Sequence, residues 1–432
     1  MTLILADSRP VRFFSFFILY LAQGFPFGMV NTAIPGFLAE RGESPAAIGA
    51  FIGIASLPWS FKLLAAPLMD RFTYLAMGRR RPWVIVAQAG MLLAGAAFMF
   101  FPDGLDNLAV LTVLCFMLNC FSATQDVAVD GMAIDVLPPS EHGRANSFMA
   151  MGQVLGISGS GVLSAFILQS YGLPGIAAML FAAFGLILFW SVAVRERSGE
   201  KLLPWTKGEP HARSLELQAG GWAEIGTNLM KVLFLPASLL LAAASFLFLF
   251  AHSLWLALAT IVVVQDLGHA NTAYNSYVAL TGPIAAVLGL LLGHYIDSRG
   301  IKQFYIGTLL CYGLLAAVVG FTQTLWSSSV FLMSVGLLQA CIYQGTFISF
   351  IAIHMRISWV KVAVTQFSLY MAWVNLARSL GPGSIGLLEP WLERNEMYFV
   401  IALCFLVAIG LVMNVKLWVH EQKLEALNLK KR

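Results

Sequence analysis

The sequence predicts an all-α membrane protein with twelve transmembrane helices in two pseudo-symmetric bundles of six. Its 432 residues are 59% hydrophobic and 11% charged, and their mean hydropathy is +0.79. Apolar runs of about 20 residues, the length that crosses a bilayer, recur along the whole chain. One sizeable polar stretch, residues 195–235, separates the first six runs from the last six.

Each predicted span is an apolar run that ends at charges or at Gly and Pro turns. The first run is too long for the apolar core of a cleaved signal peptide, so we expect it to remain as a span. The spans are predicted at residues 12–39, 45–69, 82–101, 107–135, 144–170, 174–194, 236–264, 271–296, 302–323, 327–355, 359–388 and 396–419. We therefore expect an N-terminal six-helix bundle at 1–194, a cytoplasmic linker at 195–235 and a C-terminal six-helix bundle at 236–432.

The basic residues indicate an orientation in the membrane. The joints that follow even-numbered spans are basic, with Arg144 at the edge of the joint after the fourth span, whereas the other joints are on balance acidic or neutral. Cytoplasmic loops carry an excess of Lys and Arg. We therefore expect both termini to lie in the cytoplasm.

The two halves repeat one pattern after their second spans. Residues 66–71 (APLMDR) and 293–299 (GHYIDSR) each place a small residue four positions before an aspartate, with an arginine after it. The shared position indicates an internal duplication. A carboxylate at a helix end can pair with arginines and with helix N-termini when the cytoplasmic face closes. We expect a gate there from Asp70, Arg71, Arg79, Arg80, Asp135, Arg144, Asp297 and Arg299.

Several short blocks carry a family resemblance over essentially the whole chain. They are residues 20–26 (YLAQGFP), 57–62 (LPWSFK), 66–71 (APLMDR), 125–137 (QDVAVDGMAIDVL), 364–367 (VTQF) and 378–382 (RSLGP). With these blocks the chain resembles the major facilitator superfamily, and within it the group of AmpG-type muropeptide permeases, acetyl-coenzyme A transporters and siderophore importers. The resemblance implies two rocking halves and a central cavity that opens alternately to each side of a bacterial inner membrane.

Three aspartates lie inside the span at 107–135. A carboxylate at membrane depth costs at least ~2.5 kcal/mol, so a compensating role is needed. Asp126 and Asp130 are four residues apart and share one helix face, whereas Asp135 faces elsewhere near the cytoplasmic end. Lys62 in the second span lies at a similar depth. The sequence leaves open whether Lys62 pairs with Asp126 or with Asp130.

Two neighbouring carboxylates repel, and this repulsion, together with desolvation, raises the affinity of one of them for a proton. We therefore predict that Asp126, Asp130 and Lys62 couple transport to protons. The alternative is a permanent Lys–Asp bridge that only fixes the packing of helices.

Arg378 is a second charge inside the membrane and precedes a helix break that we expect at the Gly-Pro-Gly of residues 381–383. Its guanidinium suits a carboxylate or phosphate of a substrate. The alternatives are a pair with Glu389 or an extension to the outer interface. Polar residues in apolar spans complete the predicted substrate-binding set: Gln23, Gln125, Gln153, Gln344, Thr365, Gln366 and Asn375, with Arg378. Any single amide or hydroxyl can instead bridge two helices.

Other kinds of site have little support in the sequence. The five cysteines and the histidines His252, His294 and His354 are scattered through apolar segments without metal-ligand spacing. A nucleophile and base pair near one interface, which a membrane enzyme would need, is not evident. We expect no enzymatic activity, no catalytic residue, no cofactor and no bound metal.

The prediction is a proton-coupled importer that acts by alternating access. From the resemblance, the substrate is a bulky amphiphilic or anionic solute, first a muropeptide-like sugar-peptide, then a siderophore, then acetyl-coenzyme A. A non-transporting membrane sensor or scaffold is the alternative of another class. The expected partners are a small-molecule substrate, protons and membrane lipid, with no nucleic acid, and the protein is expected to be a monomer.

Overall fold

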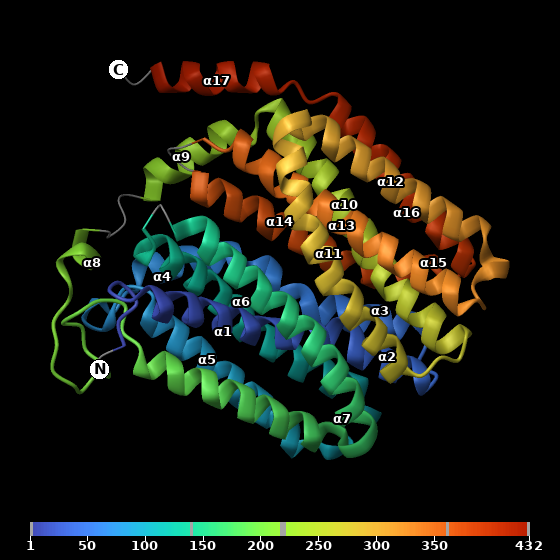
Figure 1. Ribbon diagram of the computed structural model, residues 1–432, viewed down its shortest axis with the longest axis horizontal. Coiled ribbons are helices and arrows are strands. Elements are labelled where there is room, and N and C mark those ends of the chain that lie inside the picture. Colours follow the sequence, from blue (N-terminus) through green and yellow to red (C-terminus); the bar gives the residue numbers. More distant parts are fainter. Residues whose placement is uncertain (1–2, 139–140, 217–221, 360–362, 430–432) are drawn as a thin grey trace. The chain divides into compact units, whose positions relative to one another are not determined.

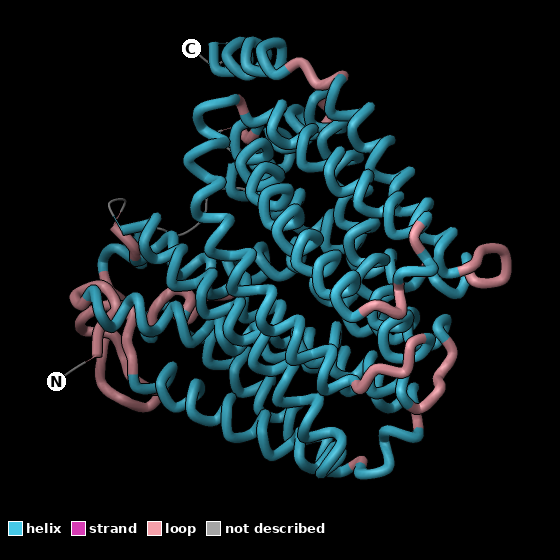
Figure 2. The backbone as a smooth tube through the Cα atoms, turned by 45° about the vertical axis from the view of Figure 1, so that its right-hand side comes forward, coloured by secondary structure: helices cyan, strands magenta, loops and turns pink. Residues whose placement is uncertain are grey.

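The computed structural model describes residues 3–138, 141–216, 222–359 and 363–429. Over these ranges nearly all regular structure is helical, and the β contact found is an isolated parallel bridge between Ile4 and Arg195. Figure 2 shows a backbone that is mostly helical, with loops confined mostly to the ends of long helices. Helical spans satisfy their own backbone hydrogen bonds, as a lipid environment requires.

The helices follow the predicted spans in order (Figure 1). The first half contains α1 (Arg9–Gly28), a π-helical turn (Met29–Ala33), α2 (Ile34–Glu40), α3 (Pro45–Ser56), a 3₁₀ turn (Leu57–Phe61), α4 (Lys62–Arg71), α5 (Arg81–Ala97), α6 (Leu108–Val136) and α7 (His142–Ala193). The polar stretch holds α8 (Ala212–Glu216) and α9 (Trp222–Leu233). The second half contains α10 (Pro236–Ile261), a π-helical turn (Val262–Asp266), α11 (Asn271–Arg299), α12 (Ile301–Phe321), α13 (Ser329–Ile357), α14 (Ala363–Gly383), α15 (Ile385–Leu388), α16 (Arg394–Met413) and α17 (Leu417–Leu429).

Among the described residues, eight helices are individually long and apolar enough to cross a bilayer. Several predicted spans differ from single long apolar helices for local reasons. The second predicted span is broken by the 3₁₀ turn at Leu57–Phe61, α7 contains both the fifth and the sixth, and α14 carries several polar residues. Only part of α11 lies among the residues whose side chains the structure describes.

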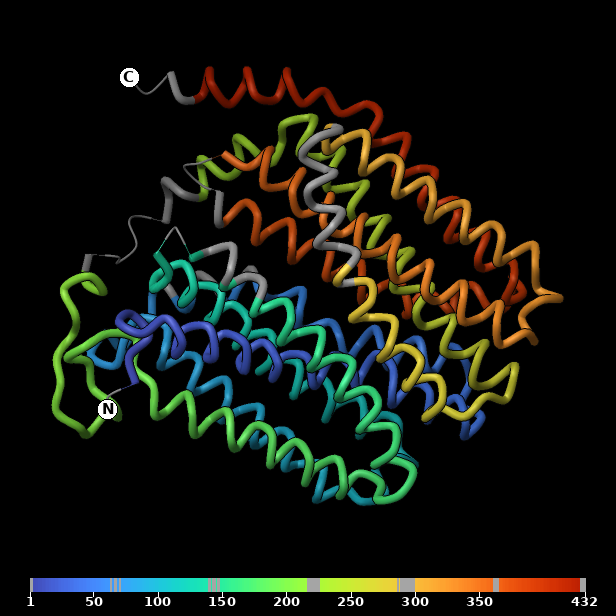
Figure 3. The backbone as a smooth tube through the Cα atoms, viewed as in Figure 1, coloured from blue at the N-terminus to red at the C-terminus, as the bar shows by residue number. Residues whose placement is uncertain are grey.

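The long helix α7 changes direction at Gly172. This glycine has φ 59° and ψ −153°, a backbone conformation that L side chains rarely adopt, and Pro174 follows it. The predicted spans at 144–170 and 174–194 are therefore two helical arms joined at one residue. Figure 3 shows the green chain turning back there.

The chain divides into two compact units. The first comprises Met1–Leu38, Ile54–Gly220 and Asn271–Ala279, and the second comprises Ala39–Gly53, Gly221–Ala270 and Leu280–Arg432. The start of α11 thus belongs to the first unit, where Asn271 Nδ2 donates a 2.8 Å hydrogen bond to the carbonyl of Ala33.

In the first unit, α1 packs directly against α7. A Cβ atom at Gly24 would lie 2.6 Å from the backbone nitrogen of Ile157, and one at Gly156 would lie 3.0 Å from Cα of Gly24. Side chains cannot fit at these distances, so the bare glycines allow the two backbones to touch. This contact fixes α1, which carries Tyr20 and Gln23, against the rest of the unit.

The core of the second unit is aromatic. Phe248 on α10 lies 6.4 Å from Tyr305, 6.5 Å from Phe350 and 6.5 Å from Phe405, measured between ring centroids. All four side chains are fully buried. Large rings of this kind dominate the packing between helices, and here they join α10, α12, α13 and α16.

The last predicted span is shorter than expected. It was predicted to reach residue 419, but α16 ends at Met413 and a separate helix, α17, begins at Leu417. The polar Asn414 and Lys416 interrupt the apolar run. Within the second unit, α17 packs Leu424 and Leu427 against Val232 and Trp359.

Candidate functional site

A charged cluster lies inside the first unit, between α4 and α6. Lys62 begins α4, directly after the 3₁₀ turn, and its Nζ forms an ion pair with Oδ2 of Asp126. Both side chains are largely buried, at 14% and 7% exposure. Of the two partners that the sequence left open for Lys62, the structure shows Asp126.

An aromatic residue also holds this lysine in place. Lys62 Nζ lies 4.5 Å from the ring centroid of Trp59, within the range of a cation–π interaction. The indole of Trp59 is itself tied to α6, because its Nε1 donates a 2.7 Å hydrogen bond to Oδ1 of Asn119. Asp126 on α6, and Trp59, which is bonded to α6, therefore both hold the ammonium group of Lys62 beside this helix.

The second carboxylate of the cluster has a different partner. The hydroxyl of Tyr20 on α1 donates a hydrogen bond to Oδ1 of Asp130, one helical turn after Asp126. Asp130 is exposed in the isolated chain, whereas Asp126 is 5% exposed. We call Tyr20, Lys62, Asp126 and Asp130 the acid cluster. With both carboxylates ionised it carries one excess negative charge, which one proton would neutralise.

Two glutamines near the acid cluster have unused hydrogen-bonding capacity. Gln125 Nε2 donates a 2.9 Å bond to the carbonyl of Leu19, but its Oε1 has no partner among the described residues. Gln23 is fully buried, and within the described part of the chain neither of its amide atoms is bonded. A buried polar atom without a partner costs about 1–3 kcal/mol. These amides are therefore suited to a polar ligand.

The second unit holds Arg378 in contact with an aromatic residue of α13. Its Nη2 donates a 3.4 Å hydrogen bond to the hydroxyl of Tyr343. Glu389, one alternative partner for Arg378, forms a 3.4 Å ion pair with Arg394. Arg378 and Tyr343 are both half-buried.

The other predicted substrate-binding residues differ in their surroundings. Gln366 is bound within the chain, since its Oε1 accepts a 2.9 Å bond from the backbone nitrogen of Trp359 and its Nε2 donates a 3.0 Å bond to the hydroxyl of Tyr370. A ligand would have to replace these bonds. Gln153 on α7, Gln344 on α13 and Thr365 on α14 are half-buried, and Asn375 on α14 is buried.

Part of the predicted gate forms a cluster at the end of α6. Asp135 accepts bonds of 3.0 and 3.1 Å from Nη1 of Arg79, and its Oδ2 lies 3.4 Å from Nε of Arg80. Arg71 is exposed. The side chains of Asp70, Arg144, Asp297 and Arg299 lie outside the described residues.

The structure adds a carboxylate to this region that the sequence analysis did not identify. Glu196, just after α7, accepts hydrogen bonds from the backbone nitrogens of Arg79 (2.9 Å), Arg80 (2.7 Å) and Arg81. Three N–H donors on one carboxylate fix the loop that carries the arginines. A glutamate directly between Arg195 and Arg197 was the available signal, but it is equally typical of a solvated linker.

Glu200 adds a second carboxylate to the same segment. Its Oε2 accepts a 2.9 Å bond from the backbone nitrogen of Arg197. The side chain of Arg197 in turn donates a 3.1 Å bond from Nη1 to the hydroxyl of Ser214. Burial, and then the charge of Glu196, raises the pKa of the Glu200 carboxyl to about 7. Burial also raises the pKa of Glu196, against the lowering effect of the three backbone donors.

The raised pKa of Glu200 predicts a pH-dependent stability for this segment. The folded state holds the proton more tightly than the unfolded state does, so the stabilisation is complete below the ordinary pKa of 4.5 and is lost as pH rises through about 7. We expect amide exchange of Arg197, corrected for its intrinsic pH dependence, to accelerate between pH 5 and pH 8. Glu200→Gln should flatten this profile, and Glu209→Gln at an exposed position should not. A flat profile in the unaltered protein would contradict the prediction.

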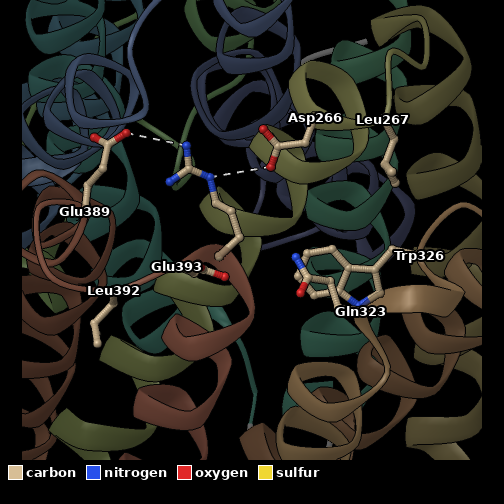
Figure 4. Close-up of a pocket in the computed structure, with 8 residues that line it drawn as sticks. Asp266, Leu267, Gln323, Trp326, Glu389, Leu392 and Glu393 are labelled. Carbon is tan, nitrogen blue, oxygen red and sulfur yellow. Dashed lines mark hydrogen bonds and ion pairs between the residues drawn. The ribbon is translucent and has the colours of Figure 1, made fainter.

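A cavity of about 580 Å³ lies in the second unit, at the ends of α10, α12 and α16. Arg394 forms ion pairs with Asp266 and Glu389, which lie on opposite sides of the view in Figure 4. The corresponding ion pairs are 3.5 and 3.4 Å long. None of the residues predicted to bind substrate or protons lines this cavity.

Known proteins resemble this chain in sequence over part of its length and in fold over nearly all of it. The Anhydromuropeptide permease of Escherichia coli K12 is 31% identical over 154 residues, which are 36% of this chain and 31% of that protein. AmpG 3 of Rickettsia prowazekii, described as a transporter, is 29% identical over 122 residues, 27% of this chain and 28% of that protein. The chain thus spans about a third of the length of these curated relatives.

The fold matches solved structures over nearly the whole chain. The crystal structure of a D-xylose-proton symporter aligns with a TM-score of 0.70 and 13% identity, covering 94% of this chain and 97% of that one. A sequence model described as Major Facilitator Superfamily matches residues 16–382. The predicted all-α fold with twelve membrane helices in two bundles is confirmed, and the protein is an integral membrane transporter. The chain belongs to the Major Facilitator Superfamily.

Proposed function

We propose that this protein imports a bulky amphiphilic or anionic solute together with protons, and that a muropeptide-like sugar-peptide is its substrate. Import proceeds by alternating access in a bacterial inner membrane, without an enzymatic step. The bundles at 1–194 and 236–432 move about the linker at 195–235, and both termini lie in the cytoplasm. The working unit is a monomer.

The acid cluster is the observation that carries the proton-coupling part of this proposal. Lys62 forms its ion pair with Asp126, whereas the hydrogen bond to Asp130 comes from a neutral donor, the Tyr20 hydroxyl. A second carboxylate at membrane depth, in addition to the one paired with Lys62, is costly unless it is protonated in part of the transport cycle. Reversible protonation of Asp130 meets this condition. A purely structural ion pair would need only Lys62 and Asp126.

Two further observations support the substrate. The relatives include a protein named as an anhydromuropeptide permease, and the match covers part of each chain. Gln23 and Gln125 offer amide atoms of the kind that bind sugar hydroxyls and peptide groups, and Arg378 offers a cation. A sugar-peptide has hydroxyl, amide and carboxylate groups for these donors and acceptors.

The contacts of Asp135 with Arg79 and Arg80 support a role in closing the cytoplasmic face. In this role the ion pairs form in one state of the cycle and break in the other. The arginine side chains are each 9% exposed and the aspartate side chain is 6% exposed. Because these charges are largely buried, breaking the ion pairs and hydrating the charges changes the free energy of the protein appreciably.

The proposal is tested with purified protein in liposomes. Radiolabelled anhydromuropeptide should accumulate when a proton gradient is imposed, and a protonophore should abolish the accumulation. A siderophore or acetyl-coenzyme A that competes, while anhydromuropeptide does not enter, would assign another substrate of the same fold. Absence of uptake of all three would favour a sensor or scaffold and contradict the proposal.

A further inference from the structure

His252, for which the sequence indicates no role, lies face to face with Tyr343 inside the second unit. Their ring centroids are 3.8 Å apart and their planes differ by 11°. His252 is 6% exposed, whereas Tyr343 is only half-buried. The imidazole of His252 therefore covers one face of the Tyr343 ring, whereas other parts of this tyrosine are accessible.

Hydrogen bonds from two other helices hold the imidazole. Nε2 of Gln339 on α13 lies 3.3 Å from Nδ1 of His252 and donates to the hydroxyl of Tyr312 on α12. The Tyr312 oxygen is 2.7 Å from the same Nδ1. Both groups can donate a proton to Nδ1, and in that arrangement a neutral imidazole carries its own proton on Nε2.

The hydroxyl of Tyr343 lies beside a cation. The Tyr343 hydroxyl accepts a bond from Nη2 of Arg378. Its own proton has no acceptor among the described residues, so it is available to a ligand. One O–H from α13 and a guanidinium from α14 thus lie side by side. Such a pair of donors matches the two oxygens of a carboxylate.

We propose that Arg378 and Tyr343 form a carboxylate subsite for the transported solute, and that His252 is the residue that positions Tyr343 in it. This inference rests on the proposed transport of a sugar-peptide and adds which group of the solute is recognised. Arg378 supplies the charge. Tyr343 supplies a directed hydrogen bond, whose direction depends on the ring staying against the imidazole.

The experiment compares two probes, an anhydromuropeptide and the same compound with its peptide carboxylates converted to amides. In Tyr343→Phe, the half-saturating concentration for uptake of the acidic probe should rise about tenfold, the usual effect of losing a hydrogen bond to a charged group. The value for the amidated probe should rise much less, because its amide oxygen still accepts the hydrogen bond but carries no charge. Tyr305→Phe is the matched control, because it removes the same hydroxyl from a buried tyrosine of the same unit, on α12. It should leave both probes unaffected.

The positioning role of His252 is tested by two replacements. His252→Leu removes the ring and should raise the half-saturating concentration for the acidic probe about as much as Tyr343→Phe does, since both remove one directed bond. His252→Phe keeps a flat ring against Tyr343 and should recover most of the affinity for the acidic probe. A residue needed only for folding would lower the maximal rate for both probes alike.

The outcomes separate this inference from the proposed function. If the unaltered protein transports the acidic probe but the variants affect both probes equally, the subsite is wrong and the transport function stands. If the unaltered protein transports neither probe, both are wrong. Where a variant loses uptake altogether, equilibrium binding of the two labelled probes to detergent-purified protein gives the same comparison.

Discussion

Asp130→Asn is expected to reduce gradient-driven uptake to the level of protein-free vesicles while leaving exchange of labelled for unlabelled substrate intact. The amide can keep the hydrogen bond from Tyr20 but cannot carry a proton. Exchange needs only the movement between inward and outward states of the loaded protein, whereas driven uptake needs the proton to travel with the substrate.

The measurement uses one preparation in liposomes, with driven uptake and exchange determined in parallel at several pH values. The dependence of exchange on pH should disappear in Asp130→Asn. Asp103→Asn, the same change at an exposed aspartate before α6, is the control and should behave as the unaltered protein. Driven uptake that survives in Asp130→Asn, or exchange that is lost together with it, would refute the role of Asp130.

Asp126→Asn is expected to destabilise the protein strongly, by about 3–5 kcal/mol, because it leaves the ammonium of Lys62 largely buried without its counter-charge. Lys62→Met should cost a similar amount for the converse reason. The double variant Lys62→Met with Asp126→Asn removes both charges and should recover most of the stability, because a neutral pair has no charge to desolvate.

Stability is measured as the fraction of detergent-purified protein that stays monodisperse after heating, with all three variants treated side by side. The recovered double variant also tests function, since it should fold and still fail in driven uptake. Single variants as stable as the unaltered protein, or a double variant as unstable as either single one, would show that this ion pair is not a major stabilising contact.

The sequence predicted the acid cluster because its geometry is mostly local. Residues four apart share a helix face, and the rise per residue places Lys62 at a comparable depth. It did not predict the partner of Lys62. The 3₁₀ turn before Lys62 advances about 120° per residue instead of about 100°, so over its five residues the direction of the side chain shifts by about 100°. That turn depends on tertiary packing around Pro58 and Trp59.

Other parts of the site depend on contacts between distant segments. Glu196 meets the loop at residues 79–81 only because α7 ends beside it. His252 and Tyr343 lie on different helices, and in an apolar span each looks like an ordinary core residue. Gln366 shows the opposite case, since its polar side chain in an apolar span suggested a cavity but makes bonds with Trp359 and Tyr370. Sequence patterns locate polar groups within the membrane better than they identify their partners.

The bonds that Glu196 accepts also set an order of events during synthesis of the chain. The backbone nitrogens of residues 79–81 precede their acceptor by 115 to 117 positions. At a translation rate of roughly 5–20 residues per second, the ribosome needs roughly 6–23 s to deliver that carboxylate. During this interval the arginine loop lacks these three backbone bonds, so the first bundle completes them only after the sixth span has left the ribosome.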